Sequence, residues 1–194
     1  MPFLAILAIV ALVIVFLISF FNRLRSIQIQ IQASIQEIGN QLKRQANLIP
    51  NLIESVKGYM KHEKDIFTSL TDARKLVNQA IESNDPTQLN KAQESIGKII
   101  KGLSVIVESN PEIKASQVVG SLMNELRDTA DKVTYARRLL IDLSADYNTA
   151  ISTIPGIWLA PTMGFKPEKG LSVPASGKFL EVSEEEIKEP SVKI

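Results

Sequence analysis

The amino-acid sequence contains no cysteine and only one histidine, His62, among its 194 residues. The lack of cysteine excludes disulfide bonds, thiolate nucleophiles and zinc–thiolate sites. A single histidine leaves little room for a histidine metal cluster or a hydrolytic triad, so we predict no catalytic residues, no metal site and no cofactor. Basic and acidic side chains nearly balance, at 22 and 21, unlike the broadly basic surface of many nucleic-acid-binding proteins. The sequence therefore argues against most enzyme classes and against a nucleic-acid partner.

Charged residues are also missing from residues 3–21, where only Ser19 is not apolar. As a helix this stretch is about 28 Å long, close to the ~30 Å hydrocarbon core of a bilayer. A cleaved signal peptide is the alternative, but it needs a basic leading region, a shorter apolar core and a small-residue cleavage site. We therefore predict an uncleaved transmembrane anchor, residues 1–21, that meets the lipid bilayer through residues 3–21.

The charges that flank the apolar stretch predict its orientation. No lysine or arginine precedes it, whereas Arg23 and Arg25 follow it directly. Because basic residues are retained on the cytoplasmic side, we expect these two arginines to determine the topology. The prediction is a single-pass protein of the cell membrane with its N-terminus outside and the rest of the chain in the cytoplasm.

The next unit, residues 22–165, has the pattern of an all-helical domain. Between residues 22 and 47 the apolar residues recur every three or four positions, which is typical of an amphipathic helix and close to a coiled-coil heptad. The residues at 27–32 also alternate as in a β-strand. Only Ile29 lies off the helical stripe, so a helix is favoured.

Prolines mark the expected helix boundaries. Because a proline disfavours helical geometry in the residue before it, we predict a tight turn at 47–49 and a second helix from Pro50. A single long helix kinked at Pro50 is the alternative. The Asp-Pro pair at 85–86 and the Asn-Pro pair at 110–111 predict two further helix starts. Four amphipathic helices with short connections predict an up-and-down four-helix bundle whose last helix returns towards the membrane.

Residues 154–165 are apolar, broken by prolines, and carry the only tryptophan. One interpretation is that they cap the end of the bundle. The other is that Trp158 and Phe165 contact the membrane interface, where aromatic side chains are enriched. From residue 166 the apolar stripe stops and charged residues mix with proline, glycine and serine, so residues 166–194 are predicted to be a disordered tail.

Several short motifs occur in an order that resembles the LemA family of bacterial membrane-anchored helical proteins. They are FN at 21–22, QLKR at 41–44, LIPNLIESVKGY at 48–59, HE at 62–63, TDAR at 71–74, NPEIKA at 110–115, ARR at 136–138, DYNTAI at 146–151, PG at 155–156 and GFKP at 164–167. The resemblance covers residues 3–167, and the stretch at 48–59 is its most specific part. The tail beyond Pro167 does not match.

The resemblance implies a four-helix bundle on a single membrane anchor, without known enzymatic activity. Some members of the family help to shape the magnetosome membrane. This sequence departs from the family pattern at Ile35, Gly39, Gln45 and Asn47, where the family usually has tryptophan, an acidic residue, a basic residue and aspartate. Contacts that other members make through their first helix are therefore in doubt here.

Three hypotheses for function follow. The first is a non-enzymatic, membrane-anchored scaffold in the bacterial cell envelope that binds an unidentified protein or a second copy of itself. The second is a structural protein that remodels a membrane, as in the magnetosome. The remote third is a hydrolase-type enzyme centred on His62, which lacks the second histidine of an H-E-x-x-H zinc motif.

Overall fold

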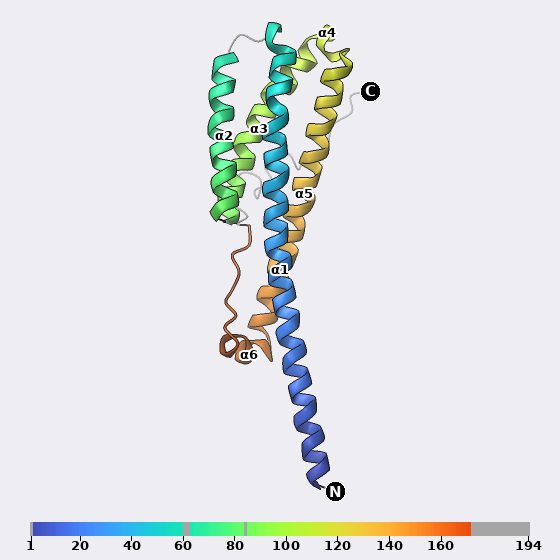
Figure 1. Cartoon of the computed structure of the whole chain (residues 1–194), viewed down its shortest axis with the longest axis vertical. Coiled ribbons are helices and arrows are strands. Elements are labelled where there is room, and N and C mark those ends of the chain that lie inside the picture. Colours follow the sequence, from blue (N-terminus) through green and yellow to red (C-terminus); the bar gives the residue numbers. More distant parts are fainter. Residues whose placement is uncertain (1, 60–62, 84, 172–194) are drawn as a thin grey trace, which may run out of the picture.

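The computed structural model describes residues 2–59, 63–83 and 85–171, and these residues form helices and no strand (Figure 1). This confirms the predicted all-α class. The elements are α1 (Pro2–Val56), a 3-10 turn (Lys57–Tyr59), α2 (Glu63–Ser83), α3 (Pro86–Ser109), α4 (Pro111–Lys114), α5 (Gln117–Ser152) and α6 (Gly156–Thr162). Residues 27–32 lie inside α1, so the strand alternative is wrong.

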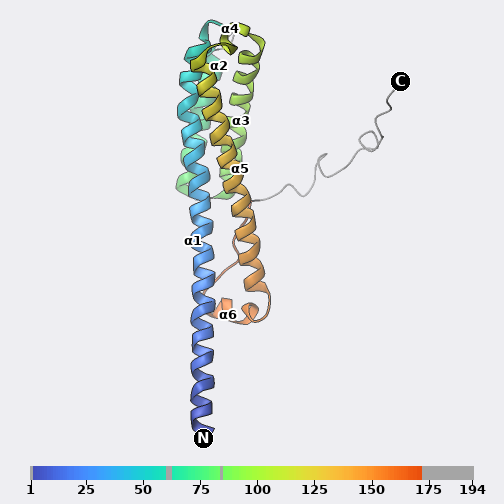
Figure 2. The same ribbon diagram turned by 90° about the vertical axis from the view of Figure 1, so that its right-hand side faces the viewer.

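Helices α2, α3 and α5 lie along the C-terminal part of α1. We call this part of α1 and the three helices the helical body. The chain ascends along α1, descends in α2, ascends in α3 and descends again in α5 (Figures 1 and 2). Helix α1 contacts α2, α3 and α5. As expected, the last long helix returns towards the N-terminal part of α1, and α6 lies at its end and contacts α5 (Figure 2).

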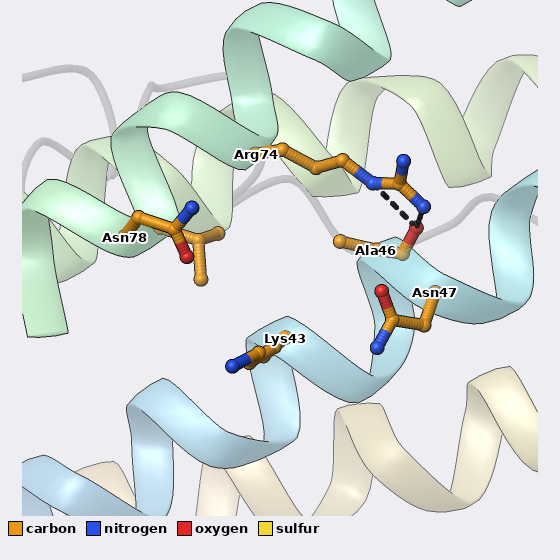
Figure 3. A pocket seen from close by; sticks show the side chains of 6 residues that line it. Lys43, Ala46, Asn47, Arg74 and Asn78 are labelled. Atoms are coloured by element: carbon orange, nitrogen blue, oxygen red, sulfur yellow. Dashed lines mark hydrogen bonds between the residues drawn. The ribbon is translucent and has the colours of Figure 1, made fainter.

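Helix α1 continues through Pro50, so the predicted turn at 47–49 is wrong and the alternative of one long helix is correct. A proline at this position removes the N–H that would bond to the carbonyl of Ala46, four residues earlier. Arg74 on α2 replaces that donor, because its Nε and Nη2 donate to the Ala46 oxygen at 3.3 and 3.0 Å (Figure 3). Buried residues on both sides of the proline, including Ile49 and Ile53, also keep the helix against the body.

The later boundaries agree in part with the sequence. Asp85 caps α3 by accepting a hydrogen bond from the Thr87 N–H at 2.9 Å, as the Asp-Pro pair predicts. The Asn-Pro pair starts only the four-residue α4, and α5 begins afresh after Ser116, whose Oγ accepts from the Val119 N–H. The predicted fourth helix is therefore two helices, and its break is made by a serine cap.

The core runs the length of the helical body. Each long helix contributes buried leucines, for example Leu42 from α1, Leu70 from α2, Leu103 from α3 and Leu140 from α5. The first buried side chain along the described chain is Leu24. The core thus begins just beyond the apolar stretch that opens the sequence.

The start of the predicted tail is packed on the helical body. Residues 166–171 have no regular secondary structure, yet Leu171 is buried and Glu168 is hydrogen-bonded to α1 and α5. The predicted onset of disorder at residue 166 is therefore too early by at least these six residues. The remaining tail, 172–194, lies outside the described residues.

Candidate membrane-facing site

The N-terminal part of α1 is a bare apolar helix. Its side chains from Phe3 to Phe16 are all exposed, and the 18-residue window that is most apolar has no buried residue. Within the described part of the chain, this is the one helix long and apolar enough to cross a membrane. A helix that is apolar on all sides and uncovered by protein is compatible with a membrane anchor.

Arg23 and Arg25 follow this apolar part on the same helix, and both are exposed. Arg25 donates from Nη1 to the side-chain oxygen of Gln28 at 3.3 Å. The two charges therefore lie two and four residues beyond Phe21 on the helix, as the sequence predicts. Their effect on topology stays a prediction.

Phe165 lies inside this end of the helical body. Its ring centroid is 5.3 Å from that of Phe21 and 6.4 Å from that of Tyr147, the latter in an edge-on arrangement. Its side chain is buried. The predicted lipid contact of Phe165 does not agree with this position, because the ring joins α1 to α5 instead of facing outward.

Backbone geometry folds the segment 154–165 back onto α5. A Cβ on Gly156 would lie 1.8 Å from the Ala150 carbonyl oxygen, so only glycine allows this close approach. Gly164 follows the C-cap of α6 with φ +80°; the Phe165 N–H donates to the Ala160 oxygen, and the Gly164 N–H donates to the Pro161 oxygen. This is a Schellman motif, and it turns Phe165 inward while the preceding helix stays at the surface.

Three apolar side chains of this segment are left exposed, and we call them the α6 apolar cluster. Its members are Ile154, Ile157 and Trp158, of which Trp158 is 65 % exposed. They lie at the end of the helical body that adjoins the bare part of α1 (Figures 1 and 2). Phe165 and Ala160 are buried, as expected if this segment caps the bundle. Trp158 is exposed, as a contact with the membrane interface would require.

A polar network holds the same end together. Gln28 on α1 donates from Nε2 to the Tyr147 hydroxyl and to the Glu168 carboxylate, both at 3.1 Å. Asn148 on α5 donates to the Glu168 carbonyl at 2.9 Å and accepts from its N–H at 3.0 Å. Burial raises the pKa of Tyr147, and the negative charge of Glu168 raises it further. The network fixes residues 166–171 across α1 and α5.

Sequence reasoning did not identify this network. Asn148 belongs to the DYNTAI stretch at 146–151, which is one of the LemA-like motifs but gives no indication of what Asn148 contacts. Gln28 lies in the alternating stretch at 27–32, and Glu168 lies in the predicted tail. Nothing in the sequence near either residue indicates that the two are hydrogen-bonded. The bonds join residues that are 119 and 140 positions apart, which local patterns do not predict.

The described residues bring together no group of three or more histidine, cysteine, aspartate or glutamate side chains that would hold a metal ion. His62, the centre of the remote enzyme hypothesis, lies outside the described residues. The predicted lack of catalytic residues, metal and cofactor stays a prediction.

Comparison with known proteins identifies similar sequences. The model of the LemA family matches residues 34–189. The match extends beyond Pro167, so the expectation that the tail lies outside the resemblance is wrong, and it begins at residue 34 instead of residue 3. Magnetosome protein MamQ of Magnetospirillum gryphiswaldense is 25% identical over 151 residues, which cover 64% of this chain and 54% of MamQ. The chain thus spans about half the length of this relative.

Proposed function

We propose that this chain, which belongs to the LemA family, is a non-enzymatic, membrane-anchored helical protein of the bacterial cell membrane that presents its helical body to a partner. The observation that carries the proposal is the division of α1 into a bare apolar part and a part packed in the core, without a break between them. A continuous helix would hold the body rigidly on the bilayer, with residues 3–21 in lipid.

The body is proposed to stand in the cytoplasm. Arg23 and Arg25 follow the apolar part directly, which supports an N-terminus outside. The same two side chains are exposed, so phosphate groups of anionic lipid are accessible to them at the membrane surface.

The proposed partner is a protein or a second copy of this chain. Tyr135 on α5 is 71 % exposed, and with Leu139 of α5 and Ala33 of α1 it borders an apolar groove on the helical body. Exposed aromatic side chains beside an apolar groove favour protein contact. The balanced charge of the chain supports a protein partner over a nucleic acid.

Extraction of membranes tests the anchor. The full chain is expected to stay in the membrane fraction after washing with alkaline carbonate and to be released by detergent. A variant without residues 2–21 is expected in the soluble fraction. Release of the full chain by carbonate alone would contradict the anchor.

A membrane-remodelling protein is the second candidate. It is supported by the α6 apolar cluster beside the bare part of α1 and by the similarity to a relative named as a magnetosome protein. Apolar side chains that enter one leaflet at the interface expand that leaflet and favour curvature. Under this proposal Trp158 lies in the interface.

Fluorescence of Trp158 tests this placement, because the chain has no other tryptophan. In proteoliposomes of the full chain, brominated lipid is expected to quench Trp158. The matched control is a Trp158→Phe, Tyr135→Trp double variant. Position 135 is similarly exposed, and it lies on α5 about 18 Å from Tyr147 in the direction away from α6. Equal quenching in both proteins would contradict the interface position, and vesicles of unchanged shape at high protein density would contradict remodelling.

A hydrolase centred on His62 remains the remote third candidate. A His62→Ala variant with unchanged phenotype would remove it, since no second histidine is available to take over its role.

A further inference from the structure

A cavity of about 230 Å³ lies between α1 and α2, far from the membrane-facing site. Figure 3 shows its lining, with Lys43 and Asn47 contributed by α1 and Arg74 and Asn78 by α2. Ala46 and Val77 form the rest of the lining. All four polar residues are exposed, so two cations and two amides border an open pocket of roughly the size of a small molecule.

Arg74 is held in place before any ligand arrives. Its Nε and Nη2 donate to the Ala46 carbonyl that Pro50 leaves without a helical partner. These bonds use two of the five N–H donors of a guanidinium group, so three remain. A side chain that is already oriented loses little conformational entropy on binding.

Among the residues that the structure describes, neither Lys43 nor Arg74 has an acidic partner. Arg44, the next residue along α1, instead pairs with Glu125 at 2.6 Å. Asn47 and Asn78 bring amide groups to the cavity from opposite sides (Figure 3). The cavity thus offers an excess of hydrogen-bond donors and of positive charge.

We propose that this cavity binds one small oxyanion, a phosphate or carboxylate group, through Lys43, Arg74 and the amides of Asn47 and Asn78. An oxyanion accepts hydrogen bonds at several oxygens, which matches the ammonium, guanidinium and amide donors around the cavity.

The ligand is proposed to be soluble and not a lipid headgroup of the membrane that holds the anchor. Lys43 lies 22 residues beyond Phe21 on the same helix. At the rise of an α-helix this places the cavity about 33 Å from the end of the apolar part. A headgroup of that bilayer does not reach so far.

Titration of the full chain in a neutral maltoside detergent tests the proposal, with inorganic phosphate as the probe and calorimetry as the readout. Saturable binding is expected. The Lys43→Gln variant is expected to bind about tenfold more weakly, because it loses one charge-assisted bond. The matched control is Lys101→Gln on α3, which removes an exposed lysine from a helix that contributes nothing to the cavity, and its affinity is expected to stay within about twofold.

A second readout locates the site. The nitrogen resonance of the Arg74 Nε–H group is expected to shift with the same affinity that calorimetry gives. Thermal unfolding checks that Lys43→Gln folds as the parent does. Absence of saturable phosphate binding, equal weakening by Lys43→Gln and Lys101→Gln, or an unchanged Arg74 resonance would each overturn the proposal.

Discussion

The two parts of α1 belong to one helix but have opposite surroundings. Residues 2–21 are apolar on every side and largely exposed, whereas residues 22–56 carry an apolar stripe that is buried under α2, α3 and α5. Leu12 in the first part is 70 % exposed, and Leu42 in the second is fully buried. The same residue type is thus exposed in one part of the helix and buried in the other.

The distribution of apolar residues around a helix, more than their number, determines where the helix lies. A helix that is apolar all round has no polar face to give to water. A striped helix needs protein neighbours on one side only. The change from one pattern to the other occurs between Phe21 and Leu24, at the level where Phe165 contacts Phe21.

Truncation of Leu12 and of Leu42 to alanine should give the largest difference in stability between the two parts of α1. Leu42→Ala is expected to lower the free energy of unfolding of the body by about 2–5 kcal/mol, because it leaves a cavity in a packed core. Leu12→Ala is expected to leave it unchanged. Denaturant unfolding of the full chain in detergent measures both, and equal losses would mean that the apolar part packs against the body.

A charge placed on each part should have the next largest effect. Leu12→Arg, at the middle of residues 3–21, is expected to make membrane insertion less favourable by about 3 kcal/mol. Ile29→Arg, at a position that is 56 % exposed on the helical body, should not reduce insertion. A biosynthetic insertion assay on residues 2–40 compares the two, and an identical response would contradict the boundary near Phe21.

The bond between Arg74 and the Ala46 carbonyl explains how the second part continues past Pro50. Arg74→Leu is expected to lower the free energy of unfolding by about 1 kcal/mol, since it leaves the carbonyl unpaired. In a Pro50→Ala background the loss should be smaller, because the new N–H can donate to the same carbonyl. Equal losses in the two backgrounds, measured by urea unfolding, would show that Arg74 acts in another way.

The smallest effect concerns alkaline pH. The pKa of Tyr147 is raised by burial, and that of Tyr59 by its hydrogen bond to Glu112. Folding therefore favours the neutral phenols, so their contribution is complete below the unfolded pKa of about 10 and is lost as pH rises through the higher folded pKa. In a Tyr59→Phe background, unfolding free energies between pH 8 and pH 11 should fall at the alkaline end, and Tyr147→Phe should flatten that fall. An unchanged slope would contradict the buried position.

The sequence predicts what periodic patterns and local caps determine. The apolar start, the stripe of α1 and the Asp85 cap follow from residue spacing and from short-range hydrogen bonds. The turn that Pro50 predicts does not form, because the compensating donor, Arg74, is 28 positions away from Ala46 and leaves no local signal. The sequence leaves open whether Phe165 caps the bundle or contacts lipid, because its burial depends on the distant rings of Phe21 and Tyr147. Disorder is predicted from residue 166 because the composition does not reveal the bonds from Gln28 and Asn148 that hold Glu168.

The most direct measurement of the central claim uses the lack of native cysteine. Single cysteines are introduced by Pro2→Cys, Ser26→Cys and Ser121→Cys, at positions that are exposed in the parent structure. In spheroplasts treated with a membrane-impermeant maleimide, we predict labelling at position 2 and protection at positions 26 and 121 until lysis. Labelling at 26 and 121 with protection at 2 would reverse the topology, and labelling at all three before lysis would contradict a membrane-spanning anchor.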